Sequence, residues 1–404
     1  MGVVNDATIT AIRKGFSRLY QRGIQSAQSK WKRIAVEVPS GDAVEVHGWI
    51  GRFPQMKEWK EGAKRQLRSI AEGAYQLPNK KFEATIDLPV TAIEDDRIGV
   101  YGPLAETMGQ ESMDHLDRGV FAALNDAATL VCSDGKTFFA TDHPRYAEVD
   151  RTGTDYATSN IVHGSPSDPA LSGEGTGTMT AIGDVLDGRS YRVKIVAAGK
   201  TGTATFVVSI DGADYPADAD AIATAAAYKI PGTDITIGFT DANASPTNSF
   251  KADDVWSFST PTPWYLLHTK NPVKPLIYQR RTPAEFQAIT DRQQSQVFMS
   301  DAFLYGVRAR RAFGVGFWQM AVACGAELTE SNFDTTFQTM QEIRWDGGDP
   351  TGFSPDLLVC GPRLRADSNT VIKMQYAEGM KSNPNYMAVD VECTPWLLPL
   401  ATLP

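Results

Sequence analysis

Residues 102–128, GPLAETMGQESMDHLDRGVFAALNDAA, contain the clearest helical pattern in the chain. The large apolar residues recur at steps of four or eight, at Leu104, Met108, Leu116, Val120 and Leu124. This spacing predicts a helix with one apolar face. Pro103 suits its first turn, although Gly109 and Gly119 weaken the pattern. At about 1.5 Å per residue the helix would be about 40 Å long, so we expect it to act as a spine for the fold.

Composition narrows the possible classes of protein. A chain of 404 residues, 42% of them hydrophobic, predicts two or three domains with buried cores. The net charge of -9 argues against a general nucleic-acid binder, which would carry a large basic face. The sequence shows no apolar run of membrane-spanning length and no signal peptide, so a cytoplasmic protein with no membrane partner is expected.

Neither a metal site nor a catalytic site is predicted. The cysteines show no CxxC spacing and no neighbouring histidine, so they are interpreted as reduced core residues. Asp142 and His143 could suggest acid/base chemistry, but adjacent residues rarely converge on one proton and no nucleophile motif is near. We expect no catalytic residue, no metal and no cofactor. The cysteines are Cys132, Cys324, Cys360 and Cys393.

Residues 1–33 form a basic segment in an acidic protein. Seven Lys or Arg residues stand against Asp6 alone. An apolar stripe at helical spacing predicts an amphipathic helix that lies on a surface such as another subunit. The alternatives are a solvated first helix of the core domain and a helix on a membrane surface. The stripe consists of Ile9, Ile12, Phe16 and Leu19.

The next segment predicts a long hairpin. Residues 44–50 alternate as a strand does, and residues 51–68 mix basic and aromatic side chains. Residues 81–88 alternate again and could pair with residues 44–50 or with residues 66–75. A hairpin with so few apolar residues usually needs a partner surface. Binding of single-stranded nucleic acid is an alternative use of its aromatic and basic residues.

The character of the sequence changes between residues 165 and 262. Period-two runs and glycine-containing turns predict a β-sandwich or barrel of about six strands, between linker-like flanks. Twelve acidic and six basic residues place -6 of the total charge here. We interpret this acidic insert as a solvent-exposed decoration. Its run of Asp211, Asp214, Asp218 and Asp220 lacks the spacing of a known calcium loop and is interpreted as acidic surface.

Residues 263–404 return to mixed α and β character. Strands are expected at residues 264–267, 305–318 and 357–360. Asn332 is expected to cap a helix that includes Ile343, and a further helix is expected at residues 363–380. Outside the insert, the fold class is therefore α+β.

Several motifs together resemble the major head subunit family of Mu-like phages, which has the coat-protein fold first described for the Hong Kong 97 phage. They occur in family order on both sides of the insert and extend over much of the chain. They are His47-Gly48-Trp49-Ile50-Gly51-Arg52-Phe53-Pro54, Asn79-Lys80-Lys81-Phe82-Glu83, Glu94-Asp95-Asp96-Arg97-Ile98-Gly99-Val100-Tyr101, Asp134-Gly135-Lys136-Thr137-Phe138-Phe139, Pro263-Trp264-Tyr265-Leu266-Leu267, Tyr305-Gly306-Val307-Arg308-Ala309-Arg310 and Ser354-Pro355-Asp356-Leu357-Leu358-Val359.

The resemblance implies a major capsid protein with five segments. They are an N-terminal arm at 1–43, an extended loop at 44–90, a peripheral domain with the spine helix at 91–164, an inserted all-β domain of immunoglobulin-like or sandwich type at 165–262, and the axial and remaining peripheral domain at 263–404. We do not associate the insert with the basic family pattern.

The implied function is self-assembly into an icosahedral phage head that encloses double-stranded DNA. The partners would be further copies of the chain in hexamers and pentamers, a scaffolding protein, a portal, a decoration protein, and DNA held without specificity on the inner surface. The protein would reside in the virion capsid after assembly in the host cytoplasm, and no enzymatic activity is implied.

Contacts between subunits are expected to combine apolar burial with exposed ion pairs. The apolar candidates are Ile12, Phe16, Phe53 and Trp59. The basic candidates are Arg13, Arg18, Lys57, Lys60, Lys64 and Arg68, and the acidic candidates are Glu94, Asp95, Asp96, Glu106 and Asp114.

Two other functions remain open from the sequence. The inserted β domain could be a carbohydrate- or surface-binding module carried on a non-viral shell scaffold. An enzyme that uses Asp142 and His143 would require a cleft in which polar groups converge.

Overall fold

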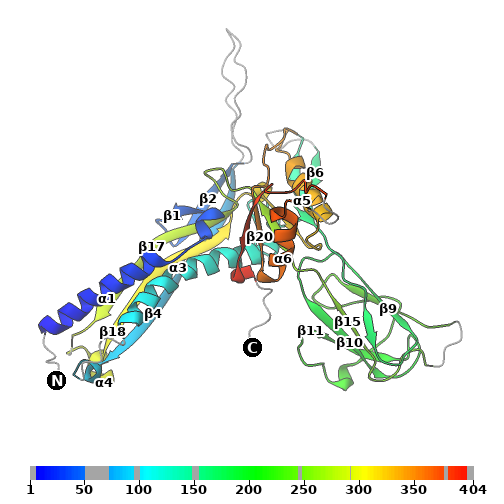
Figure 1. Ribbon diagram of the computed structural model, residues 1–404, viewed down its shortest axis with the longest axis horizontal. Coiled ribbons are helices and arrows are strands. Elements are labelled where there is room, and N and C mark those ends of the chain that lie inside the picture. Colours follow the sequence, from blue (N-terminus) through cyan, green and yellow to red (C-terminus); the bar gives the residue numbers. More distant parts are fainter. Residues whose placement is uncertain are drawn as a thin grey trace, which may run out of the picture.

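The computed structural model describes residues 6–50, 72–94, 101–147, 154–243, 248–291, 293–376 and 381–397. Figure 1 shows two arms that diverge from a central body. Two long helices and long strands form one arm, called here the spine arm, and a β-sandwich forms the other. Within the described ranges, no helix is both long enough and apolar enough to span a bilayer.

The predicted spine is α3, Gly102–Asn125, followed by a single 3-10 turn, Asp126–Ala128. Its apolar stripe is buried except at Leu104, which is 45% exposed. Gly109 has a structural role, because a Cβ there would lie 2.2 Å from the carbonyl oxygen of Tyr20. A Cβ on Gly23 would lie 2.0 Å from the carbonyl oxygen of Glu106. The two glycines therefore let helix α1, Asp6–Ser26, approach the spine backbone to backbone.

Helix α1 packs on the spine arm of its own chain. Ile12 and Phe16 are buried in a cluster that also contains Ala105 of the spine, and the Phe16 ring lies 5.0 Å from the Tyr305 ring. The prediction that Ile12 and Phe16 supply apolar area to a neighbouring subunit therefore applies only to the part of them that stays exposed, 8% and 5%. Most of that area is already covered within the chain.

A four-stranded sheet of order β1-β17-β18-β4 supports the two helices. Strand β4 pairs antiparallel with β18 over its whole length, with Lys80 opposite Arg311 and Pro89 opposite Ala302. This corrects the predicted pairing of residues 81–88 inside the hairpin. The short helices α2, Val90–Glu94, and α4, Ser295–Ser300, lie at the far end of the arm. The strands are β1, Ala35–Pro39, β4, Lys80–Pro89, β17, Leu276–Ile289, and β18, Ala302–Val315.

The hairpin consists of β2, Val44–Ile50, and β3, Glu72–Pro78, with Ile50 opposite Glu72. This agrees with the predicted strand at residues 44–50, whereas residues 81–88 pair neither with that strand nor with β3. A second two-stranded ribbon joins β5, His143–Tyr146, to β6, Asp155–Thr158.

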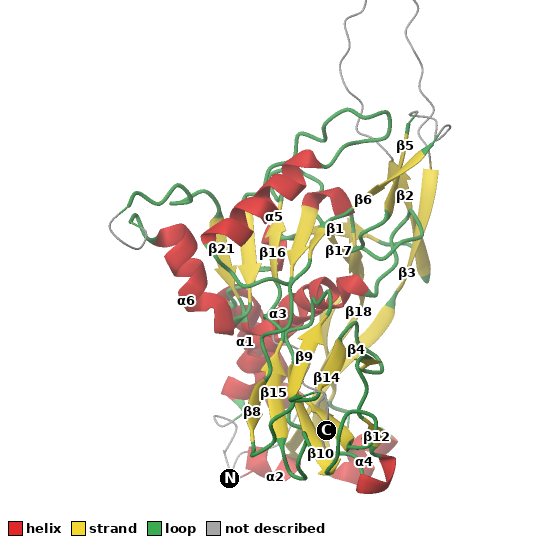
Figure 2. Cartoon of the chain, turned by 90° about the vertical axis from the view of Figure 1, so that its right-hand side faces the viewer, coloured by secondary structure: helices red, strands yellow, loops and turns green. Residues whose placement is uncertain are grey.

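The central body contains a five-stranded sheet of order β21-β20-β16-β19-β7, and α5, Glu330–Glu342, lies against it (Figure 2). Thr329 caps α5 by accepting a hydrogen bond from the Asn332 amide, so Asn332 is not the cap. The helix predicted at residues 363–380 is shorter: a turn at Pro362–Leu364, α6 at Arg365–Ser368 and a π-helical turn at Asn369–Lys373. The strands are β7, Ile161–Val162, β16, Trp264–Leu267, β19, Ala321–Cys324, β20, Leu357–Cys360, and β21, Asp390–Cys393.

The insert is a β-sandwich with one core. Val193, Phe206 and Trp256 of a five-stranded sheet pack in one cluster with Ile237 and Phe239 of a three-stranded sheet. The sheet orders are β12-β11-β10-β15-β8 and β13-β14-β9. The strands are β8, Ala170–Ser172, β9, Thr178–Ile182, β10, Ser190–Ala197, β11, Thr205–Ile210, β12, Ile222–Ala223, β13, Tyr228–Lys229, β14, Thr236–Thr240, and β15, Val255–Ser259.

The sandwich is attached at both ends to the same sheet. Strand β7 precedes it and β16 follows it, and the two lie on either side of β19 in the central body.

Candidate assembly surfaces

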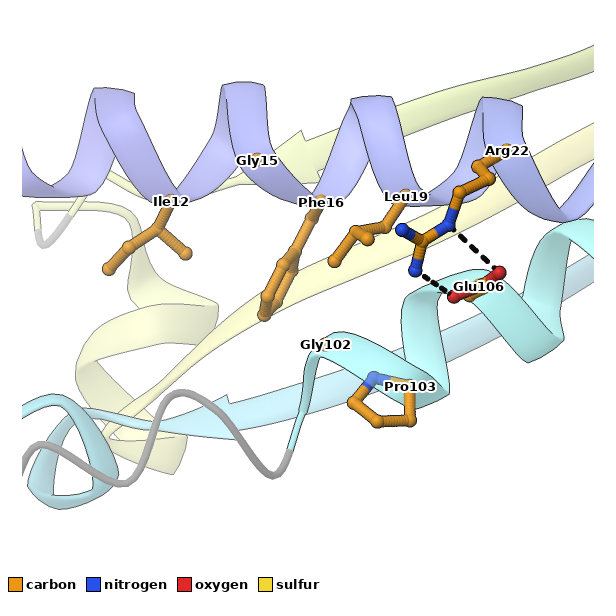
Figure 3. A pocket seen from close by; sticks show the side chains of 8 residues that line it. All are labelled: Ile12, Gly15, Phe16, Leu19, Arg22, Gly102, Pro103 and Glu106. Carbon is orange, nitrogen blue, oxygen red and sulfur yellow. Dashed lines mark hydrogen bonds and ion pairs between the residues drawn. The ribbon is translucent and has the colours of Figure 1, made fainter.

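A pocket of about 400 Å³ opens between α1 and the start of the spine (Figure 3). Its lining is mostly apolar, with one ion pair, in which Arg22 Nε donates to Glu106 Oε1 at 2.9 Å. The shared hydrogen bonds raise the pKa of Arg22 and lower the pKa of Glu106. The pocket is lined by Ile12, Gly15, Phe16, Leu19, Arg22, Gly102, Pro103 and Glu106.

Glu106 was predicted to pair with a basic residue of another subunit. In the structure it pairs with Arg22 of its own chain, so that prediction is corrected. Asp114 is half-buried on the spine, and burial, followed by the charge of Glu111, raises its pKa.

Besides Arg22, five of the seven cations of the N-terminal segment fall into two groups. Lys30 and Arg33 form ion pairs with Glu392, and Arg33 also pairs with Asp390 at 3.0 Å. Arg13, Lys14 and Arg18 are exposed on α1 and have no acidic partner among the residues that the structure describes. The predicted interface cations Arg13 and Arg18 are therefore still available to a neighbour.

The other predicted interface residues cannot be placed. Glu94 ends α2, and its side chain is not described. The remaining candidates lie outside the described residues: Phe53, Lys57, Trp59, Lys60, Lys64, Arg68, Asp95 and Asp96.

Sequence reasoning missed an apolar surface at the far end of the spine arm. Phe298 and Met299 of α4 are 78% and 83% exposed, whereas Val297 beside them is 2% exposed. Within VFM alone, no periodicity distinguishes a buried from an exposed side chain. Only the packing of α4 on the sheet reveals which side chains face outward.

Asp142 and His143 do not act together. Asp142 pairs with Lys136, whereas His143 Nδ1 lies 2.7 Å from Asp134 Oδ2. The other ring nitrogen, Nε2, lies 3.2 Å from the carbonyl oxygen of Phe138. The two ring nitrogens therefore face oxygens of Asp134 and Phe138, and neither faces Asp142.

His143 belongs to a buried structural cluster with Asp134 and Trp318 rather than to a reaction centre. Its ring is fully buried and stacks on Trp318 at 3.9 Å between ring centroids. Cys132, Asp134 and His143 bring three possible metal-ligand atoms within 4.8 Å, which the cysteine spacing did not predict. However, both His143 nitrogens are already hydrogen-bonded, and burial raises the pKa of the Cys132 thiol, which opposes the thiolate that a metal requires.

The acidic run of the sandwich shows no converging carboxylates in the described part of the chain. Asp211 instead accepts a hydrogen bond from the Ser190 amide, and it lies 3.8 Å from Arg189. Its role in these contacts is structural.

Comparison with known proteins identifies the family. The profile of the family described as Mu-like prophage major head subunit gpT matches residues 9–171 and 237–397, which is most of the chain. The chain belongs to this family. Its members are head subunits of Mu-like phages, and this chain is accordingly a shell-forming protein of a phage head.

Three relatives support this membership of the Mu-like major head subunit family. The major capsid protein of Escherichia phage Mu is 28% identical over 386 residues, which is 95% of this chain and 96% of the phage Mu protein. The Mu-like prophage FluMu major head subunit of Haemophilus influenzae is 29% identical and covers 93% of this chain and 92% of its own length. The procapsid protein of bacteriophage JBD30 superposes with a TM-score of 0.67 at 31% identity, covering 97% of this chain and all of the other.

The insert departs from the family profile only in part, because individual relatives extend over it. Matches over 95% and 97% of the chain cannot omit a segment as long as residues 165–262. The family profile itself passes over only residues 172–236, and it includes β14 and β15 of the sandwich.

Proposed function

We propose that this head subunit builds an icosahedral shell around double-stranded DNA with the Hong Kong 97 type of coat architecture. Residues 1–43 would be the arm, 44–90 the extended loop, 91–164 and part of 263–404 the peripheral domain, and the rest of 263–404 the axial domain. The sandwich, residues 165–262, would be an immunoglobulin-like domain that faces outward. Its net charge of -6 would keep DNA from adhering to the outside.

One observation carries the proposal. The β2–β3 hairpin forms a two-stranded sheet of its own, separate from the larger sheets of the described residues. At its base the hairpin packs on its own chain, where Leu77 is buried with Ile277 and Ala312. A two-stranded hairpin that extends beyond such a base is marginally stable in water. It would gain a covering surface from a neighbouring copy, and the exposed Arg13 and Arg18 would approach acidic residues of another.

Further partners would be a scaffolding protein, a portal and a decoration protein. Hexamers and pentamers of this chain would form the lattice, in which many weak contacts add up to a stable shell. The shell would assemble in the host cytoplasm.

Electron microscopy of the purified full-length chain, with light scattering, tests this proposal. Closed shells, tubes or rings of five and six subunits are expected, alone or with a co-expressed scaffolding protein. A variant in which residues 48–74 are replaced by a short Gly-Ser turn should stay folded but lose these assemblies. A chain that remains monomeric at high concentration under both conditions would overturn the proposal.

A further inference from the structure

The far end of the spine arm carries an exposed apolar projection, called here the knob: Phe298 and Met299 of α4. They are the two most exposed large apolar side chains among the residues described. A single exposed apolar residue is ordinary, but two adjacent ones at the end of a projecting arm form a small patch. Burial of this patch against another surface would be favourable, because it removes apolar area from water.

The knob stands on a fixed base. Val297 is buried in the same cluster as Ile12 and Phe16, so α4 is anchored to α1. Asp301 ends the helix in the left-handed region, at φ 46°, and its carbonyl oxygen accepts a hydrogen bond from the Val90 amide at 3.0 Å. A left-handed aspartate persists only where its surroundings hold it. The base therefore holds the knob in one orientation before any partner arrives.

The same end of the arm carries the α1–spine pocket, and Figure 3 shows Ile12, Phe16 and Leu19 projecting from α1 toward the start of the spine. Gly15 leaves space in the wall, since a Cβ there would meet nothing within 4 Å. Leu104, 45% exposed, follows Pro103 of the lining. At about 400 Å³ the pocket is at the lower end of the range for small-molecule sites, about 300–1,000 Å³, and it can take large apolar side chains.

The charges around the two surfaces are opposite in sign. Arg13, Lys14 and Arg18 lie on α1, with Arg18 one helical turn from Gly15 of the pocket. Asp291 and Asp301 are exposed on either side of α4. Arg292 reduces the acidic excess in sequence but lies outside the described residues. Complementary charge of this kind orients an encounter between surfaces.

We propose that Phe298 and Met299 of one copy insert into the α1–spine pocket of the next copy. Knob and pocket are different surfaces of one chain, so the contact is heterologous and can repeat from copy to copy. The inference rests on the shell-forming function and names one contact by which the shell closes. The three α1 cations would surround the inserted knob and face its aspartates.

Four variants test the contact by light scattering and electron microscopy. Phe298→Ser removes the larger knob side chain, and Gly15→Leu fills the pocket. Each should raise the concentration needed for assembly by about tenfold or more, while circular dichroism stays unchanged. Gly15→Ala, which adds little volume, and Ile182→Ser, which removes a 65% exposed side chain from the sandwich, should assemble as the parent does.

Crosslinking then locates the contact. Particles co-assembled from differently tagged Gly15→Cys and Phe298→Cys chains should yield a disulfide-linked heterodimer on mild oxidation, and Gly15→Cys with Ile182→Cys should not. If shells form normally from Phe298→Ser and Gly15→Leu and no specific heterodimer appears, the knob contact is wrong while the shell function stands. If no chain assembles at all, the shell function itself has failed.

Discussion

The charged side chains of the sandwich are paired within their own domain more fully than those of the spine arm, and its exposed apolar side chains are more scattered. Lys194, Lys229 and Lys251 of the sandwich each reach a carboxylate of the same domain at 2.8–2.9 Å. Its exposed large apolar residues lie on three different strands, Leu171, Ile182 and Ile222. The spine arm instead exposes an adjacent Phe and Met at its far end, and three cations of α1 lack an acidic partner in the described ranges.

This difference indicates where the shell holds together. Charged side chains that are already paired gain little free energy from contact with a neighbour. Cations without a partner in the described ranges can gain ion pairs, and adjacent apolar residues can gain burial. We therefore expect the spine arm, together with the β2–β3 hairpin, to contribute more to assembly than the sandwich does. The family profile passes over residues 172–236 of the sandwich, so the family pattern does not specify that part of the chain.

The largest expected effect is a loss of stability, and it tests whether the sandwich folds around a core independent of the spine. Trp256 is 2% exposed in the sandwich core, and Trp256→Ala should cost about 3–5 kcal/mol of stability. Because that core is separate from the core of the spine, hydrogen exchange should speed up in the sandwich alone. Phe121→Ala, in the spine, should speed exchange in the spine and central body instead. Equal acceleration of hydrogen exchange in both arms by Trp256→Ala would show that the two cores are not independent.

A smaller effect is expected where the N-terminal segment joins the spine. Asp117 is 4% exposed and accepts hydrogen bonds from Ser29 Oγ at 2.8 Å, the Lys30 amide at 2.9 Å and the Trp31 amide at 2.8 Å. Asp117→Ala leaves these donors without their acceptor and should cost about 2–4 kcal/mol in urea unfolding. Asp126→Ala, on the exposed end of the same helix, is the control and should change stability little. Equal losses from the two substitutions would refute the anchoring role.

The buried contact between Asp134 and His143 should make the free energy of unfolding depend on pH. Burial alone would raise the pKa of Asp134, but the hydrogen bond and charge of His143 outweigh it and hold that pKa below its usual value. A lowered folded-state pKa contributes stability that is present above the unfolded pKa, about 4, and is lost as the pH falls through the folded pKa.

Denaturation of the parent and of Asp134→Asn at pH 7 and at pH 3 measures this contribution. The parent should be more stable than Asp134→Asn at pH 7, and the gap between the two should narrow at pH 3. Asp142→Asn, which removes an exposed partner of Lys136, should show no such dependence. A gap that stays constant with pH would exclude the charge of Asp134 as its source.

The smallest effect concerns the paired surface of the sandwich. Lys229 and Asp234 are 64% and 76% exposed, so Lys229→Ala should change stability by less than about 1 kcal/mol and leave assembly unchanged. Arg18→Ala should leave stability equally unchanged, but it should weaken assembly at low salt and make assembly less sensitive to added salt. If the two variants assemble alike at all salt concentrations, the unpaired cations of α1 have no role in assembly.

Local patterns predicted much of the fold. The period of four at Met108, Leu116 and Val120 is a property of one helix, so the sequence alone predicts α3 to within one turn. Likewise, the alternation of residues 44–50 matches β2. The pairing of β4 with β18 could not be predicted in this way, because it joins segments more than 200 residues apart, and strand periodicity does not specify the partner.

The candidate site shows a second limit. The apolar stripe of α1 predicted that Ile12 and Phe16 are covered, but amphipathicity does not say whether the cover comes from the same chain or from another. The adjacency of Asp142 and His143 was correctly given no catalytic meaning, but the sequence did not predict that the fold turns Asp134 toward His143. Phe298 and Met299 lie in a six-residue helix, too short for any periodicity to reveal its exposed side.

The double attachment of the sandwich has a mechanical consequence. A domain on a single linker swivels and absorbs an external pull in that linker. Here the polypeptide enters through β7 and leaves through β16, on either side of β19. A pull on the sandwich is therefore divided between two strands of one sheet and loads their hydrogen bonds together. The outer domain should pass force to the central body rather than swivel on a linker.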